Sequence, residues 1–319
     1  MKKIITKIFL ILFVAIIAPM TSCNDELDYE LFTKNVYLTT NGWEELRVKI
    51  QEGTNTVTIP LSVSINGTTG NDQEVKVSLK YDMDTLDKYN FEKYREQPEL
   101  YYTALPENVY SFGEDHLVIK SGEIKAITYL TIDLNKVDDK YADYVLPLSI
   151  ESTSGYSIAK SAYSKVLYHL NLENSFSGNY SGTIDIFKTK SNGDNDKDSK
   201  LSINNKSFYA ISDRVCYFYA GQFDRSSAVR DDFIITINLD DDNLVTLHSP
   251  NTELDVKLES YTYKVDIEPN LNDKRYETHN ISINLKYTYK DLTDLDKPIM
   301  RAEGTVATVK QILKENTVN

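Results

Sequence analysis

Aromatic side chains are the residues of this chain whose types and spacing could do chemistry: it contains 23 Tyr and 11 Phe but a single Trp. A flat aromatic ring can stack on the C–H face of a ring such as a pyranose, while nearby amides and carboxylates bind the hydroxyls. Trp43 follows Asn41-Gly42, a turn pair that could display the indole, although the ring could equally close the end of a core. Tyr101 and Tyr102 lie in an irregular stretch and could form a platform.

Three further pairs of tyrosines are spaced two residues apart in strand-like runs. This spacing places both rings of a pair on one face of a strand. Packing in a core or barrel wall is favoured over a ligand-binding stripe, because tyrosine is a common strand residue. All three pairs remain candidate binding residues: Tyr217 and Tyr219, Tyr261 and Tyr263, and Tyr287 and Tyr289.

Local signatures of catalysis and of metal binding are absent from the sequence. The four histidines are isolated, so we predict neither a metal site nor a cofactor. The sequence contains no Gly-x-Ser-x-Gly elbow and no glycine-rich phosphate loop between a strand and a helix. Glycoside hydrolysis needs only two facing carboxylates, and 48 acidic residues neither support nor exclude it. We therefore expect no catalytic residues and no enzymatic activity.

The charge balance argues against a nucleic-acid partner. The chain has 35 Lys and Arg against 48 Asp and Glu, which gives a net charge of −13. Proteins that bind a phosphate backbone concentrate cationic side chains instead. We expect a solvated acidic surface.

The N-terminus is typical of a secretory signal. Lys2, Lys3 and Lys7 precede an apolar run over 8–18, which is too short for a membrane-spanning helix. The small residue before Cys23 resembles a bacterial lipobox, with Met20 at the place where leucine is usual. We predict a signal peptide over residues 1–22 and acylation of Cys23, which anchors the chain in outer-membrane lipid.

The residues after Cys23 indicate where the anchored chain would lie. The acidic cluster over 24–28 resembles the surface-export signal of Bacteroidetes lipoproteins, which implies a lipid-anchored protein on the outer-membrane cell surface. Residues 23–34 are predicted to form the lipidated tether. Cys216 then has no partner and is expected to be a buried thiol.

Alternating apolar residues predict an all-β protein. In residues 35–172 the runs are short and separated by turn signals, for example over 56–63, 75–79 and 124–134, which favours an immunoglobulin-like β-sandwich. One exception, 84–97, carries a helical stripe with Asp84 as its expected cap.

A second antiparallel β domain is predicted over residues 173–319. About eight alternating strands with short turns suit an up-and-down meander, closed as a small barrel or folded as a second sandwich. The polar segment 188–200 is predicted to be a mobile hairpin loop.

The N-terminal half resembles the immunoglobulin-like N-terminal domain of unknown function found in surface lipoproteins of gut Bacteroidetes. The segments that carry this resemblance over roughly 35–172 are Asn35–Leu38, Leu105–Tyr110, Ile119–Glu123 and Tyr144–Ile150. The second half opens with Phe176–Gly182 and resembles the β-rich C-terminal domain that often follows in the same lipoproteins.

The resemblance implies a function, because such proteins are commonly encoded in polysaccharide-utilisation loci. It implies capture of a glycan at the cell surface. We therefore expect a cell-surface lipoprotein that binds polysaccharide or oligosaccharide non-catalytically and hands it to an outer-membrane transporter complex or to a hydrolase nearby. No binding residue carries over, and we expect the distal C-terminal domain to be the binder. The alternatives are a structural or adhesive, fimbria-like subunit and, less favoured, a glycoside hydrolase. Asp84-Thr85-Leu86 also matches a Bacteroidetes O-glycosylation pattern, which makes Thr85 a candidate acceptor.

Overall fold

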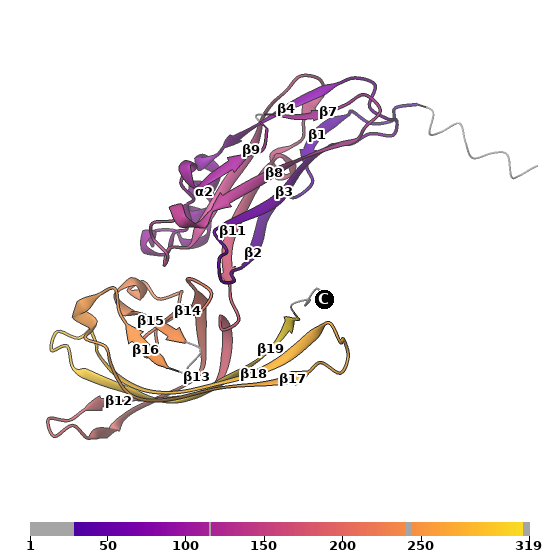
Figure 1. Cartoon of the computed structure of the whole chain (residues 1–319). Helices are drawn as coiled ribbons and strands as arrows, with labels where there is room; N and C mark the ends of the chain where they lie inside the picture. Colours follow the sequence, from indigo (N-terminus) through magenta and orange to yellow (C-terminus); the bar gives the residue numbers. More distant parts are fainter. Residues whose placement is uncertain (1–28, 115, 240–243, 315–319) are drawn as a thin grey trace, which may run out of the picture.

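The structure, a computed structural model, describes residues 29–114, 116–239 and 244–314 and consists of two β domains (Figure 1). The N-terminal domain is the indigo and magenta part of Figure 1, and the C-terminal domain is the orange and yellow part below it. The prediction of an all-β fold is confirmed. The predicted signal peptide and Cys23 lie outside the described residues, whereas Glu30 and Lys34 at the start of the described chain contact the turn over 67–70.

The N-terminal domain is a sandwich of two sheets. One sheet has the order β10-β1-β3-β8-β6, and the other has the order β2-β11-β9-β4-β7 with β5 paired to β9. Alternating apolar residues from both sheets fill the space between them, among them Val63, Leu130 and Leu146, each at most 1% exposed. The strands are β1 (Asn35–Leu38), β2 (Gly42–Lys49), β3 (Thr56–Ile65), β4 (Val75–Tyr81), β5 (Thr103–Ala104), β6 (Tyr110–Phe112), β7 (Leu117–Ile119), β8 (Lys125–Asp133), β9 (Tyr144–Thr153), β10 (Ser157–Ile158) and β11 (Lys165–Glu173).

One longer helix, α2 (Met83–Tyr94), covers the outer face of the second sheet. Its buried Leu86 packs against Val145 and Leu167 of the sheet. The cap is Asp82, whose carboxylate accepts from the Thr85 backbone N–H, and not the predicted Asp84. The helix also ends three residues before the predicted end. The other helical elements of the described residues are short: α3 (Ser161–Ser164) and the 3-10 turns η3 (Pro98–Leu100), η4 (Glu107–Val109), η5 (Leu134–Lys136), η6 (Arg230–Phe233) and η7 (Thr252–Leu254).

The C-terminal domain is a single eight-stranded antiparallel sheet that curls into a nearly closed barrel. Its order, β16-β15-β14-β13-β12-β19-β18-β17, is an up-and-down meander in which β19 returns to pair with β12. The two ends of this order, β16 and β17, contact each other. Of the two predicted alternatives, the structure has the barrel. The strands are β12 (Gly178–Thr189), β13 (Asn195–Ala210), β14 (Val215–Tyr219), β15 (Ile234–Leu239), β16 (Val245–His248), β17 (Lys257–Pro269), β18 (Tyr276–Lys290) and β19 (Ile299–Leu313).

The strands β17, β18 and β19 are long and extend past the barrel as a curved arm (Figure 1). The hairpin over 188–200, predicted to be a loop, is mostly strand, because β12 continues to Thr189 and β13 begins at Asn195. Cross-strand pairs such as Lys188 with Asp196 hold these polar residues in the ladder. Among the described residues, no helix is both long and apolar enough to span a lipid bilayer.

A buried lysine organises the loop after β14. Lys206 on β13 is 6% exposed, and its Nζ donates to the backbone carbonyls of Tyr219 at 2.8 Å, Gly221 at 2.6 Å and Phe223 at 3.4 Å. Burial lowers the pKa of Lys206 to about 8, so the amine is still mainly protonated at neutral pH. Its three donors match the three carbonyls.

We expect Lys206→Met to destabilise the folded chain by about 2–3 kcal/mol, because three carbonyls lose their donor and stay buried. Chemical denaturation of the variant and of wild type measures this free energy. The matched control is Lys197→Met on the exposed hairpin, which should leave the midpoint unchanged. Equal midpoints for Lys206→Met and Lys197→Met would contradict the role of Lys206.

Candidate binding site between the two domains

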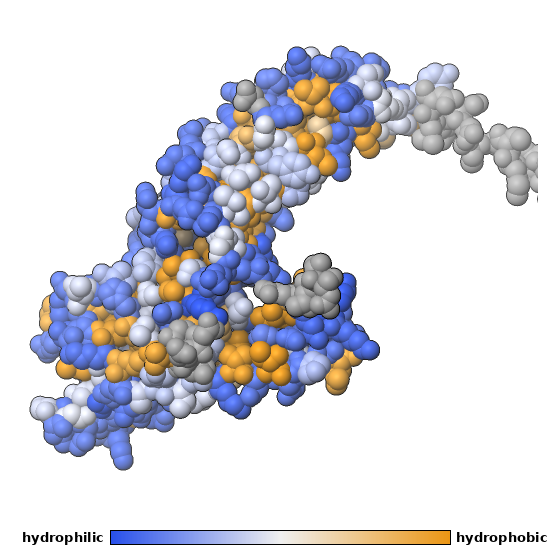
Figure 2. Space-filling view, in the orientation of Figure 1, coloured by the Kyte–Doolittle hydropathy of each residue, from blue (hydrophilic) through white to orange (hydrophobic). Residues whose placement is uncertain are grey.

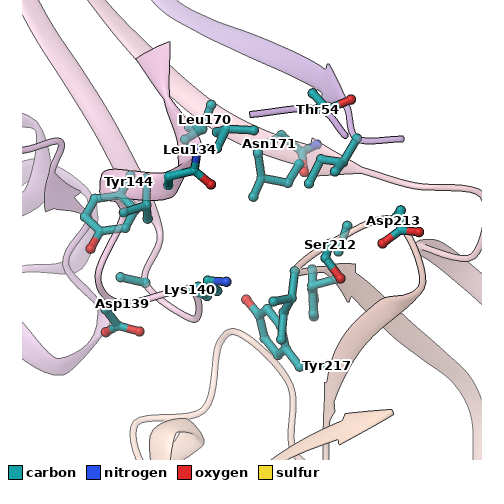
Figure 3. A pocket seen from close by; sticks show the side chains of 18 of the residues that line it. Thr54, Leu134, Asp139, Lys140, Tyr144, Leu170, Asn171, Ser212, Asp213 and Tyr217 are labelled. Atoms are coloured by element: carbon teal, nitrogen blue, oxygen red, sulfur yellow. The ribbon is translucent and has the colours of Figure 1, made fainter. Parts of the chain in front are cut away.

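A cavity of about 240 Å³ lies at the junction of the two domains (Figure 3). The N-terminal domain contributes the loop between β2 and β3, the segment from η5 to the start of β9, and the last residues of β11. The C-terminal domain contributes the turn between β13 and β14 together with Arg225. Figure 3 shows Tyr144 and Lys140 of the first domain across from Tyr217 and Ser212 of the second. Both domains must therefore be present to form the cavity.

Three asparagine amides line this cavity with their hydrogen-bonding groups available. Asn55 and Asn135 are exposed and Asn171 is half-buried. Within the described part of the chain, none of the three side chains makes a hydrogen bond, whereas the buried amide of Asn174 nearby makes several. An amide offers two donors and one acceptor oxygen, which suits a ligand with adjacent hydroxyl groups.

Tyrosine rings form part of the apolar wall, which also includes aliphatic side chains such as Leu134 and Ile211. Tyr209 and Tyr217 lie 5.0 Å apart between ring centroids, and Tyr217 meets Tyr141 of the other domain edge to face at 5.4 Å. The Cζ atom of Arg225 lies 3.9 Å from the Tyr209 ring centroid, within cation–π distance. Arg225 also donates to the Tyr217 hydroxyl at 3.2 Å. These contacts fix the rings in one orientation.

A charged cluster joins the domains beside the cavity. Asp143 of the N-terminal domain is 8% exposed and lies 3.1 Å from an Arg225 nitrogen and 3.5 Å from an Arg230 nitrogen. Burial raises the pKa of Asp143, but His169 and the two arginines outweigh it, and the pKa ends below its ordinary value. The carboxylate therefore stays charged at neutral pH.

His169 extends this cluster into the N-terminal domain. Its Nε2 lies 3.8 Å from Asp143, and its Nδ1 lies 3.0 Å from both carboxylate oxygens of Glu45. Its ring stacks on Trp43 at 5.2 Å between centroids. The predicted residue Trp43 is therefore connected to the domain junction through one histidine.

The structure brings Trp43 and Tyr102 together, but beneath α2 and not in the cavity. Trp43 lies on β2, not in the predicted turn, and stacks on Tyr89 at 4.7 Å. Tyr102 lies 4.8 Å from Trp43, and its hydroxyl accepts from Lys93 at 2.7 Å. Tyr101 stands beside this cluster and donates to the Arg95 carbonyl. Their contacts are those of a packed cluster between helix and sheet.

The three predicted tyrosine pairs lie in different places. Tyr287 and Tyr289 are 1% and 3% exposed inside the barrel, and Tyr219 is 3% exposed on the face of β14 that carries Tyr217. The half-buried Tyr261 and Tyr263 pack against the barrel core. Among these six residues, Tyr217 alone lines the junction cavity.

The other predicted positions are also located. The Thr85 hydroxyl donates to Asp82 at 2.8 Å and accepts from Lys165 at 2.7 Å, so its use as a glycosylation acceptor remains a prediction. Cys216 is fully buried, and burial raises the pKa of its thiol to about 12. No group of three or more potential ligands placed to hold a metal ion occurs within the described residues.

Comparison with known proteins places the chain in a structural class. Residues 32–157 match a family model for an N-terminal domain, and residues 164–311 match one for a C-terminal domain. None of the curated proteins matches the chain.

Solved structures from Bacteroides share the fold over most of their length. Two proteins of unknown function from Bacteroides ovatus are 22% and 23% identical, with TM-scores of 0.75 and 0.74. The matches cover 90% and 89% of this chain and 98% and 95% of theirs. An auxiliary nutrient binding protein from Bacteroides thetaiotaomicron is 20% identical with a TM-score of 0.68, covering 84% of this chain and 92% of that one.

In fold and domain order the chain is thus a two-domain β protein of the kind that these Bacteroides structures share. Its two halves each match the domain that the corresponding family model describes.

Proposed function

We propose that this chain is a non-catalytic binding protein for polysaccharide or oligosaccharide in a glycan-uptake system. Acylated Cys23 would hold it on the outer-membrane cell surface, where an outer-membrane transporter complex would receive the ligand. The observation that carries the proposal is the junction cavity, in which asparagine amides that make no hydrogen bond within the described residues line the same wall as fixed tyrosine rings. This combination suits the hydroxyls and the C–H faces of sugars.

Two further observations support the proposal. Binding sites occur preferentially at domain interfaces, and the cavity takes residues from both domains. A protein with the same fold over most of its length is described as an auxiliary nutrient binding protein. We therefore locate the site at the junction rather than in the C-terminal domain alone.

Affinity electrophoresis of residues 24–319 through gels containing plant, host and fungal polysaccharides tests this function. We expect one or two polysaccharides to retard wild type. The double variant Asn55→Ala/Asn171→Ala should bind about tenfold more weakly, since each lost hydrogen bond contributes about 1 kcal/mol. Both side chains lack protein hydrogen bonds in the described structure, so the variant should fold normally.

The matched control is Asn280→Ala on β18, outside the cavity, which should bind as wild type does. If no polysaccharide retards folded wild type, the proposed function is wrong. If the double variant binds as tightly as wild type, the ligand binds elsewhere. Release of reducing sugar during the assay would show that the chain is an enzyme.

A further inference from the structure

Two additional hollows adjoin the junction cavity and lie along the boundary between the two domains. One, of about 550 Å³, lies between the end of β2 and the end of β19. The other, of about 350 Å³, lies beside the linker between β11 and β12. The larger shares Ile50 and Gln51 with the cavity, and the smaller shares Asn171 and Tyr209 with it. In Figure 2 the surface is hollowed between the upper domain and the arm of the lower one.

The charged side chains among those that line these two hollows are mainly cationic, although the whole chain carries a net charge of −13. Among the described residues that line them, Glu173 is the single carboxylate. Each hollow has three cationic side chains, drawn from both domains: Arg47, Lys49, Arg225, Lys310 and Lys314. Such a local reversal of charge attracts anions to this part of the surface.

Three of these cations have carboxylate partners within the protein. Arg225 is bound by Asp143, Arg47 lies 3.8 Å from Glu173, and Lys314 lies 3.8 Å from Glu277. For Lys49 and Lys310, no carboxylate of the described residues lies within 4.0 Å. The Lys310 Nζ instead donates to the Asn174 carbonyl at 2.8 Å, which uses one of its three donors.

Lys49 and Lys310 are close enough to repel each other. Burial lowers the pKa of Lys310. Cys216 and Glu173 act in the opposite direction, and the ammonium of Lys49 adds a smaller lowering effect. Glu173 lines the same hollow but lies within 4.0 Å of neither ammonium group, so these two like charges are stabilised when an anion binds between them.

We propose that Lys49 and Lys310 bind an acidic group, a uronic carboxylate or a sulfate, on the glycan that occupies the junction. This inference rests on the proposed function and specifies its ligand class as an acidic polysaccharide. The sugar ring next to the one in the cavity would place its anionic substituent between the two ammonium groups, one from each domain.

Paired polymers that differ in charge alone test this inference. Affinity electrophoresis would compare polygalacturonate with its methyl ester and dextran sulfate with dextran, using residues 24–319. We expect at least one acidic polymer to bind about tenfold more tightly than its neutral partner. A second run in 0.5 M salt should reduce this preference, since the site is open to solvent.

Lys49→Gln and Lys310→Gln should each reduce binding of the acidic polymer about fivefold to tenfold and leave binding of the neutral one unchanged. Lys49 is exposed, so its variant keeps the test valid even if Lys310→Gln folds poorly. The matched control, Lys80→Gln on β4, removes the same charge outside the hollows and should bind as wild type does.

The outcomes separate the two proposals. Equal binding of acidic and neutral glycans would overturn the acidic ligand and leave the glycan-binding function in place. A preference for acidic polymers that survives Lys49→Gln would overturn the assignment to these lysines. If no glycan of either kind binds the folded chain, both proposals fall. Preference for the carboxylate pair or for the sulfate pair identifies which anion the site accepts.

Discussion

Replacing Asp143 by asparagine should destabilise the chain by about 3 kcal/mol and loosen the docking of the two domains. The carboxylate lies between Arg225 and Arg230 of the other domain, and Arg230 is 7% exposed. Asparagine has nearly the same shape but no charge, so two largely buried guanidinium groups would lose their counter-ion. Breaking a buried ion pair by removing one partner typically costs about 3–5 kcal/mol.

Chemical denaturation measures the loss of stability, and small-angle X-ray scattering measures the domain arrangement. Asp231→Asn is the matched control, because Asp231 lies 3.7 Å from Arg230 but its side chain is 79% exposed. An exposed pair contributes between 0 and about 1 kcal/mol, so this variant should behave nearly as wild type does. Equal losses for the two variants would show that the buried cluster does not hold the domains.

The carboxylate of Asp143 also makes the stability of the folded chain depend on pH. The pKa of Asp143 in the folded chain is below its ordinary value of 3.8. Its contribution to stability is therefore fully present above about pH 4 and is lost as the pH falls through the lower folded value. In Asp143→Asn, the decline of stability in acid should be shallower than in wild type.

The sequence predicted the strands better than the way they assemble. Runs such as 56–63 and 75–79 lie in β3 and β4, because alternation directly reports which side of a strand is buried. Alternation did not reveal that β12 pairs with β19, more than a hundred residues later, and that pairing joins the two halves of the eight-stranded sheet. Polar residues over 195–200 lack the pattern, yet the ladder with β12 keeps them in a strand.

The candidate site could not be located from local sequence. Its residues come from separate loops and strand ends, and neither Asn55 nor Asn171 belongs to a motif. Tyr209 and Arg225 were also missed, because their importance lies in contacts across the domain junction. The spacing of Tyr287 and Tyr289 correctly placed them on one face of a strand. That this face lines the barrel interior depends on how the whole sheet curls.

Two glycines let β12 and β19 approach each other where the barrel curls. Gly182 on β12 pairs with Val306, and Gly304 on β19 pairs with Ile184. Between Ser181 and Ile184 the register of β12 against β13 shifts, as at a β-bulge, which bends the strand. A Cβ at Gly304 would overlap the Thr183 carbonyl oxygen and lie 2.7 Å from the Ile184 Cα. Both neighbours are backbone atoms, so relief requires one strand to move.

Gly304→Ala should therefore destabilise the barrel by about 3 kcal/mol or more, because the added methyl group would push β19 away from β12 along their ladder of eight residue pairs. Thermal unfolding followed by circular dichroism measures the change in Tm. Gly304 is a cleaner test than Gly182, whose φ of +153° would add backbone strain to the steric clash.

The matched control is Gly70→Ala, where an added Cβ meets nothing within 4 Å and φ lies outside the left-handed region. That variant should be neutral or slightly stabilising, since alanine reduces the entropy of the unfolded chain. A Tm for Gly304→Ala equal to that of Gly70→Ala would mean that β12 and β19 can separate without cost. The curl of the sheet would then depend on the apolar core inside the barrel, and not on the close approach at this pair of glycines.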